Sequence, residues 1–279
     1  MFLLQKVYQK EIIIMKNNFI SLKNKISLIT GAAGFIGSEI SNELCLNGSD
    51  VILIDNNKNK LLALEKKLQK IYAVNIKSLC LDLTKEASRK RIEKLIEKDF
   101  NHIDIIINSI GIVGTDKIIG WNEKFERQSI QAWNKAIDTN LSSIFFLIQT
   151  LYRFIKRSKN GSIINISSIY GTNAPDWELY KGTNMNNPAA YSISKAGLNY
   201  MTKWLAETLA PDVRVNSISP GGIYRNQNKL FVKKYIKKTL LGRMASEKDI
   251  VGPVLFLASE MSSYITGQNI IIDGGISIK

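Results

Sequence analysis

The sequence predicts a single α/β domain, in which helices cover both faces of a doubly wound, parallel β-sheet. Two observations support this fold class. Short apolar runs rich in Ile, Val and Leu alternate with segments of helical periodicity, and a glycine-rich turn follows the first strand-like run. The alternation is typical of parallel sheets, because each crossover helix packs on a face of the sheet. We therefore expect the ligand site at the carboxyl ends of the strands.

Length and composition are consistent with one soluble, cytoplasmic domain. The chain has 279 residues, 45% of them hydrophobic, which allows a sizeable core. No apolar run reaches the ~18 uncharged residues that a membrane-spanning helix needs, so we expect no membrane partner. Cys45 and Cys80 are isolated, which suits a reducing compartment and indicates neither a disulfide framework nor a metal site. His102 is the only histidine and lacks the elbow motif of a Ser/His/Asp hydrolase.

The formal net charge of +14 could indicate a nucleic-acid partner, because Lys and Arg neutralise phosphates. The lysines are spread along the chain among abundant Ile and Asn, however, and do not form one patch. Residues 231–238 form a local basic cluster. A charged, solvent-facing side is usual for a surface helix and is enough to explain this cluster. We therefore expect no nucleic-acid partner.

Residues 1–24 form an N-terminal extension before the first predicted strand, and the domain proper spans residues 25–279. Charged residues interrupt every apolar run of the extension, which argues against a signal peptide. Met15 is a more ordinary start, so residues 1–14 are either an upstream extension or an artefact of start-codon choice. We expect the fold to survive deletion of residues 1–14.

A strand, a glycine turn and a helix follow one another at the start of the domain. The strand spans residues 25–30 and the helix runs to residue 46, with a turn between them that reads Gly31-Ala32-Ala33-Gly34-Phe35-Ile36-Gly37. Glycines tighten such a turn and let the backbone approach a pyrophosphate, which sits at the positive end of the helix. In this context the motif predicts a dinucleotide cofactor.

A second buried strand, residues 51–55, ends in Asp55. A carboxylate at this place can accept both ribose hydroxyls of NAD and repel the 2′-phosphate of NADP, so it favours NAD. The alternative is an aspartate that caps the next helix or turn, because Asp is a favoured cap.

The later elements continue the alternation. We expect helices at residues 61–69, 87–99 and 250–259, and strands at residues 78–83, 103–107, 163–168, 213–219 and 269–272. Several polar or small residues fall at the carboxyl edge of this sheet and are candidates for cofactor binding: Asp82, Leu83, Asn108, Ser109, Gly111, Pro220, Gly221 and Ile223.

A long helix is predicted over residues 129–155, with Asn140 in its middle. Asn is unfavourable inside a helix, because its side chain competes for backbone hydrogen bonds. Asn140 therefore either caps a local backbone irregularity or serves a site.

Ser168 ends a buried strand, and the helix that begins near residue 188 carries Tyr191 and Lys195. Residues four apart lie on one helix face, so the phenol and the ammonium can meet. A neighbouring cation favours the phenolate and lowers the phenol pKa from about 10, which suits proton exchange with a carbonyl or hydroxyl oxygen. Ser168 can hold that oxygen. Alone, such a Tyr/Lys pair is common on amphipathic helices and carries no function.

Together these motifs resemble the short-chain dehydrogenase/reductase family, from about residue 22 to residue 275. The matching positions are the glycine turn, Asp82, Asn108-Ser109-Ile110-Gly111, Asn140, Ser168, Tyr191-x-x-x-Lys195, Pro220-Gly221 and Asp273-Gly274-Gly275. The resemblance implies a Rossmann-like fold and hydride transfer between a nicotinamide cofactor and a secondary alcohol or ketone. NAD is the expected cofactor, with NADP less favoured.

By that resemblance, Tyr191 is the acid–base catalyst, and Lys195 lowers its pKa and binds the nicotinamide ribose. Ser168 orients the substrate oxygen, and Asn140 holds a water that links Lys195 to solvent. Relatives assemble as homodimers or homotetramers through two long helices, which correspond to residues 129–155 and 191–209.

Three features depart from the family pattern. The spacing of the three glycines is typical of the extended branch, whereas the chain length resembles the classical branch. The segment between Ser168 and Tyr191 carries an insertion, residues 172–187, that borders the substrate. Within it, Trp177 and Lys181 are candidate substrate contacts. The alternative is that Trp177 and Tyr180 pack as a surface flap. Arg225 stands where the family often has a threonine, and its guanidinium suits a carboxylate or phosphate of the substrate. The alternative is an ordinary exposed arginine.

Residues 223–247 are polar and basic and are predicted to form a lid over the substrate. The insertion and the segments 180–183 and 220–223 are similar to family members linked to flagellin or surface-polysaccharide modification, which places a sugar derivative first among substrates. A 3-oxoacyl-carrier-protein or polyol reductase is the alternative within this class. A non-catalytic nucleotide-binding partner is the alternative outside it.

Overall fold

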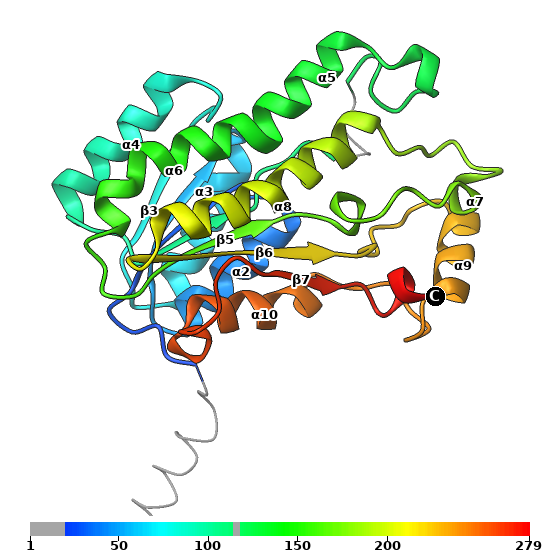
Figure 1. Ribbon diagram of the computed structural model, residues 1–279. Helices are drawn as coiled ribbons and strands as arrows, with labels where there is room; N and C mark the ends of the chain where they lie inside the picture. The colour runs from blue at the N-terminus through cyan, green and yellow to red at the C-terminus, as the bar shows by residue number, and fades with distance from the viewer. Residues whose placement is uncertain (1–19, 114–117) are drawn as a thin grey trace, which may run out of the picture.

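The computed structural model of the chain describes residues 20–113 and 118–279, so the prediction for residues 1–14 lies outside the described residues. The described chain forms one seven-stranded parallel sheet in the order β3-β2-β1-β4-β5-β6-β7 (Figure 1). Its strands are β1 (Ile26–Thr30), β2 (Asp50–Asp55), β3 (Ile76–Cys80), β4 (Ile105–Asn108), β5 (Gly161–Ile166), β6 (Val213–Pro220) and β7 (Asn269–Ile272).

Helices connect the strands and cover the sheet. They are α2 (Phe35–Leu46), α3 (Lys58–Ile71), α4 (Glu86–Asp99), α5 (Ile130–Ile137), α6 (Ser143–Ile155), α7 (Trp177–Tyr180), α8 (Ala189–Leu209), α9 (Lys229–Lys238) and α10 (Lys248–Ala258). Short 3-10 turns complete the described chain at η1 (Phe125–Arg127), η3 (Ile169–Gly171), η4 (Glu260–Ser262) and η5 (Ile276–Ile278).

The central strands divide their side chains between two hydrophobic cores. Leu28 of β1 and Ile106 of β4 face one core, whereas their neighbours Ile29 and Ile107 face the other. This follows from the two-residue repeat of a strand, and strands buried on both faces read as continuous apolar runs. Helices α2, α3 and α10 cover one face, and α4, α6 and α8 cover the other. The predicted doubly wound α/β fold is confirmed.

The winding of the sheet reverses at β1, which pairs with β2 on one side and with β4 on the other. In open parallel sheets the crevice beyond the carboxyl ends of the strands at this point is where ligands bind. The turns after β1 and β4 therefore border the expected site.

The predicted helix over residues 129–155 is not continuous. The π-helical turn η2 (Asp138–Ser142) separates α5 from α6, and the buried Asn140 lies within it. Asn140 was predicted either to cap a backbone irregularity or to serve a site, and the π-helical turn is such an irregularity. Single π-helical turns inside α-helices often mark functional sites, so the second role also stays open.

Two predicted strands end earlier than expected. β3 ends at Cys80, because Asp82 forms a turn in which its Oδ1 accepts hydrogen bonds from the Thr84 N–H (3.0 Å) and hydroxyl (2.7 Å). β5 ends at Ile166, and Ser168 caps the short turn that follows by accepting from the Tyr170 N–H at 3.2 Å.

The insertion and the predicted lid each contain one helix. Helix α7 lies in residues 172–187 and α9 in residues 223–247, and the two pack side by side at one end of the molecule (Figure 1). No helix within the described ranges is long and apolar enough to cross a membrane.

Candidate active site

The glycine turn after β1 is held by close backbone contacts. Gly31 has a left-handed backbone (φ 63°), and a Cβ there would lie 2.8 Å from the Ser109 carbonyl oxygen. A Cβ on Gly37 would lie 2.1 Å from the Gly31 carbonyl oxygen. Side chains at these two positions would push the turn away from β4 and from the start of α2, so this geometry requires glycine.

The N-terminus of α2 offers unshielded backbone donors. Gly34 is the N-cap residue and supplies no side-chain hydrogen bond, and the first turn contains no acidic residue. The first N–H groups of a helix have no partner within the helix and carry its positive dipole end. The N–H groups of Phe35, Ile36 and Gly37 therefore suit a pyrophosphate.

Asp55 links the end of β2 to the glycine turn. Its Oδ2 accepts from the Ala33 N–H at 3.0 Å, and its Oδ1 accepts from the Asn57 N–H at 2.8 Å. Asp55 therefore caps the turns beside it, which was the alternative to a role in ribose binding. Each carboxylate oxygen can accept a second hydrogen bond, so the half-buried side chain can also accept ribose hydroxyls.

Two other strand ends present polar groups at the same edge. Asn108 is fully buried and donates from Nδ2 to Asn165 Oδ1 at 2.8 Å, whereas its own Oδ1 has no hydrogen-bond partner among the described residues. Ser109 donates its N–H to the Thr30 carbonyl at 3.2 Å and so fastens the turn after β4 to β1. These two residues therefore tie the end of β4 to its neighbours β5 and β1.

Asp82 and Leu83 follow β3. Asp82 is exposed and engaged in its turn with Thr84, while the Leu83 side chain is buried in the core. Leu83 can therefore contact a ligand only through its backbone.

Asn140 connects three segments of the site. Its Oδ1 accepts from the Ile112 N–H at 2.7 Å, and its Nδ2 donates to the Ile112 carbonyl and to Ser194 Oγ, both at 3.1 Å. The side chain thus ties the loop after β4 to helix α8. This places α8, and with it Tyr191 and Lys195, against the cofactor edge.

Lys195 is buried and donates from Nζ to the Ile166 carbonyl at 2.8 Å. A Cβ on Gly111 would lie 3.4 Å from this Nζ, so the backbone after β4 passes close to the ammonium. Burial lowers the pKa of Lys195 to about 8, because a charged group is poorly solvated there.

The Ser168 side chain lies close enough to the Tyr191 phenol to act on its pKa. Burial raises the pKa of Tyr191, while the interaction with Ser168 and the charge of Arg225 act in the opposite direction. The expectation that Lys195 lowers this pKa differs from the structure in two ways. The net shift is upward because burial dominates, and the guanidinium of Arg225 is the cation that opposes it.

The segment after β6 closes the site from the other side. Gly221 donates its N–H to the Ile272 carbonyl at 2.8 Å, which continues the pairing of β6 with β7 beyond Pro220. A Cβ on Gly221 would lie 2.8 Å from Tyr235 Oη, so α9 packs directly on this turn. Ile223 is buried and bridges to Ala245.

The two candidate substrate residues of the insertion are exposed. Trp177 is 55% exposed and packs against Tyr180, with tilted rings whose centroids are 5.8 Å apart. Lys181 pairs with Glu178 at 3.7 Å, and both side chains are largely exposed. These contacts match the surface-flap alternative and do not join either residue to the Ser168, Tyr191 and Lys195 cluster.

Two tyrosines that were not candidates lie nearer to the cluster. The hydroxyls of Tyr170 and Tyr180 are 2.6 Å apart, and each phenol interacts electrostatically with Tyr191. Burial raises the pKa of Tyr180 to about 12 and raises that of Tyr170 as well, so both stay neutral near pH 7. The sequence signal for Tyr170 was its position, two residues after Ser168.

The chain matches known proteins along most of its length. The sequence model of the family described as enoyl-(acyl carrier protein) reductase matches residues 31–277. Post-translational flagellin modification protein A of Campylobacter coli is 35% identical over 258 residues, which cover 91% of this chain and 98% of that protein. The 3-oxoacyl-(acyl-carrier-protein) reductase FabG of Aquifex aeolicus is 34% identical, over 92% of this chain and 99% of that protein.

Solved structures agree. A short-chain dehydrogenase from Leptospira borgpetersenii with bound NAD+ has a TM-score of 0.78 and 36% identity, over 91% of this chain and 93% of that chain. A short-chain type dehydrogenase/reductase from Mycobacterium ulcerans has a TM-score of 0.83 at 24% identity, which supports the fold alone. The fold and its relatives define an NAD(P)-dependent oxidoreductase. The chain belongs to the short-chain dehydrogenase/reductase family.

Proposed function

We propose that the protein transfers hydride between NAD and a secondary alcohol or ketone of a sugar derivative. The observation that carries the proposal is the arrangement of Ser168, Tyr191 and Lys195. The Ser168 side chain acts on the Tyr191 phenol, and Lys195 lies one turn along α8. Its Nζ is directed to the carboxyl end of β5 and lies close to Gly111.

The chain's own groups have distinct tasks in this proposal. Ser168 holds the substrate oxygen, and Tyr191 gives a proton to that oxygen or takes one from it. Lys195 binds the nicotinamide ribose, and Asn140 keeps α8 and the turn after β4 in register. The nicotinamide, when bound, supplies or accepts the hydride.

The cofactor contacts come from the turns at the carboxyl edge of the sheet. The glycine turn and the N–H groups of Phe35 and Ile36 would hold the pyrophosphate. Asp82, Leu83, Asn108, Ser109 and Gly111 would line the nucleoside side, and Pro220, Gly221 and Ile223 the nicotinamide side. Asp55 favours NAD over NADP, because its carboxylate repels a 2′-phosphate.

A sugar derivative of surface-polysaccharide or flagellin glycan synthesis is the substrate we place first. The support is the 35% identity to a flagellin modification protein over nearly the whole chain. A 3-oxoacyl-carrier-protein substrate is the second candidate, supported by the 34% identity to FabG of Aquifex aeolicus.

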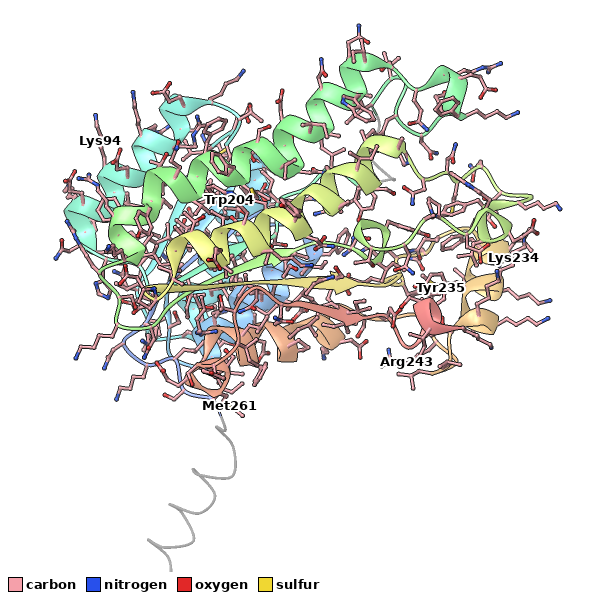
Figure 2. All side chains as sticks on the ribbon, in the orientation of Figure 1. Lys94, Trp204, Lys234, Tyr235, Arg243 and Met261 are labelled. Carbon is pink, nitrogen blue, oxygen red and sulfur yellow. The ribbon has the colours of Figure 1, made fainter. Side chains whose placement is uncertain are left out.

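We also propose that the protein is cytoplasmic and forms a homodimer or homotetramer through α6 and α8. Apolar side chains are exposed on these helices, with Phe146 44%, Tyr200 72% and Trp204 50% exposed. They line a groove of about 440 Å³, and Trp204 lies on α8 (Figure 2). Pairing of this face with a second copy would remove the groove from water.

Turnover of the purified protein tests the proposal. We would measure NADH and NADPH formation or consumption with nucleotide sugars, phosphorylated sugars, polyols and a 3-oxoacyl thioester. Tyr191→Phe should reduce kcat by about 10²–10⁴-fold, the usual contribution of a positioned acid–base group. Tyr264→Phe, which changes a fully exposed tyrosine, is the matched control.

Two results would contradict the proposal. Unchanged turnover in Tyr191→Phe would show that Tyr191 is not the acid–base catalyst. Normal NAD binding without turnover on any carbonyl or alcohol would favour the non-catalytic nucleotide-binding alternative.

A further inference from the structure

Arg225 lies in the loop that leaves β6, and its backbone is held in place. The Arg225 N–H donates to Gln227 Oε1 at 2.7 Å, and Gln227 Nε2 donates back to the Ile223 carbonyl at 2.5 Å. The loop is therefore braced by its own side chains. A braced loop fixes where the Arg225 side chain begins.

The side chain of Arg225 is fixed by two further contacts. Its Nε donates to Glu247 Oε1 at 2.9 Å, and its guanidinium carbon lies 4.6 Å from the centroid of the Phe35 ring. Both members of the ion pair are partly buried, with Arg225 29% and Glu247 21% exposed. A guanidinium held by a carboxylate and an aromatic face has lost most of its freedom to turn.

The contact with Glu247 uses only one corner of the guanidinium. Of the three side-chain nitrogens of Arg225, only Nε has a hydrogen-bond partner among the described residues. The two terminal nitrogens can still donate. Arg243 in the same segment differs, since both of its terminal nitrogens bind Asp249, at 2.8 and 2.7 Å. The planar guanidinium of Arg225 can therefore still form a paired contact with an oxyanion.

The position of Arg225 connects the two functional parts of the site. Phe35, over which it lies, is the first residue of α2 and follows the glycine turn. Its charge also acts on Tyr191 and lowers the pKa of that phenol against the effect of burial. An anion bound by Arg225 would thus lie between the start of α2 and the catalytic phenol.

We propose that Arg225 is an anion-binding residue of the active site, oriented by Glu247 and Phe35, whose terminal nitrogens bind a carboxylate or phosphate. The anion belongs either to the substrate or to the pyrophosphate of the cofactor. The inference rests on the proposed function, because it assigns a chemical class to a ligand of that site. Lys181 and Trp177, by contrast, have no place in it.

Calorimetric titration with inorganic phosphate tests the inference without requiring turnover. The wild-type protein should bind phosphate, and Arg225→Gln should bind it at least about tenfold more weakly, as expected when charge-assisted hydrogen bonds are lost. Arg243→Gln is the matched control and should bind as the wild type does, because its guanidinium already binds Asp249.

Glu247→Gln separates anion binding from a purely structural ion pair. Glu247→Gln keeps an oxygen that can accept from Arg225 Nε and removes the negative charge, so the guanidinium stays oriented and phosphate binding should stay equal or tighten. If the pair only holds the segment in place, Glu247→Gln and Arg225→Gln should lose phosphate binding together. That parallel loss would overturn the inference.

Titrations with NAD present distinguish the two sources of the anion. If the anion is the substrate's, phosphate still binds the NAD complex, and Arg225→Gln leaves the Kd for NAD unchanged. If it is the cofactor's, NAD displaces phosphate, and Arg225→Gln weakens NAD binding about tenfold or more. Phosphate binding to Arg225→Gln with wild-type affinity would overturn the inference, even if the oxidoreductase activity were established.

Discussion

The two sides of the active site are held together by different kinds of contact. On the cofactor side, the turns after β1 and β4 meet through backbone atoms, with Gly31 and Gly37 as the required close contacts. On the side that we propose to face the substrate, called the substrate side below, α7 and α9 meet through side chains. Lys234 donates to the carbonyls of Glu178 and Lys181 at 2.8 and 2.6 Å, and Lys238 pairs with Asp176.

Figure 2 shows where this second contact lies, with Lys234 and Tyr235 of α9 at the end of the molecule beside α7. The insertion is also attached on its other side. Asn122 donates to the Asn184 carbonyl at 3.2 Å, and Asn186 donates to the Glu123 carbonyl at 2.6 Å. Backbone contacts leave few permitted residues, whereas side-chain contacts can be exchanged. Cofactor binding should therefore tolerate few substitutions, whereas the residues of the substrate side can vary.

The largest expected effect concerns Lys195, whose Nζ is held by a backbone carbonyl between the two sides. Its pKa is about 8 in the folded protein against 10.5 as the ordinary value. Between these pH values the unfolded chain binds a proton that the folded protein has released, so the free energy of unfolding rises with pH. Below pH 8 the buried charge costs the folded state up to about 3 kcal/mol.

Lys195→Met removes this charge. As the pH rises from 8 to 10.5, the unfolding free energy of the wild type should therefore increase relative to that of the variant. The expected increase is up to about 3 kcal/mol. Urea denaturation of both proteins across this range measures it. A difference that does not change with pH would show that the ammonium is not penalised by burial.

The next effect tests the backbone contacts of the cofactor side. Gly37→Ala places a methyl group 2.1 Å from the Gly31 carbonyl oxygen without any movement of α2. We expect a loss of about 1–3 kcal/mol in unfolding free energy, as for other overpacked sites. NAD affinity should fall as well, because the start of α2 must shift.

Gly252→Ala is the control for this change, since a Cβ there meets nothing within 4 Å in helix α10. It should leave NAD affinity unchanged and stabilise the helix by up to about 1 kcal/mol. Chemical denaturation and a fluorescence titration with NAD provide both readings. Equal NAD affinities in the two variants would show that the close backbone contact at Gly37 does not control cofactor binding.

The smallest effect tests the side-chain contacts of the substrate side. Lys238→Ala removes the ion pair with Asp176, which is partly exposed and should contribute no more than about 1 kcal/mol. We expect a rise in KM for the substrate of a few fold, with the Kd for NAD unchanged, because α7 is then held less firmly against α9.

Lys237→Ala, which changes an exposed neighbour on the same helix, should leave both constants as they are. Steady-state kinetics and the NAD titration measure the pair. If Lys238→Ala weakened NAD binding and left KM unchanged, the contact between α7 and α9 would affect the cofactor side and not the substrate side.

The sequence was a good guide wherever short-range chemistry sets the structure. The strand, turn and helix around Gly31–Gly37 follow from local periodicity and from the conformational freedom of glycine. Asn140 was identified as either a helix irregularity or a site residue, and it lies in a π-helical turn. The exact ends of β3 and β5 were missed, because the side chains of Asp82 and Ser168 form turns that stop the strands.

The side-chain contacts around the substrate were harder to predict. Trp177 and Lys181 were plausible candidates by residue type, yet both are exposed. Tyr170 and Tyr180 were not candidates, although their hydroxyls meet near Tyr191. Residue type alone does not say which way a side chain of an irregular segment points.

The alternation of strands and helices, the glycine turn and the order of Ser168, Tyr191 and Lys195 could all be read from the amino-acid sequence. These features depend on residues that are close together in the chain or on a repeat that a strand or helix imposes. The contacts of Arg225 with Phe35 and Glu247 could be seen only in the folded protein. The same is true of the pKa of Tyr191, where burial outweighs the neighbouring cation. These outcomes depend on how distant loops pack, and packing sets both the partners of a charge and its access to water.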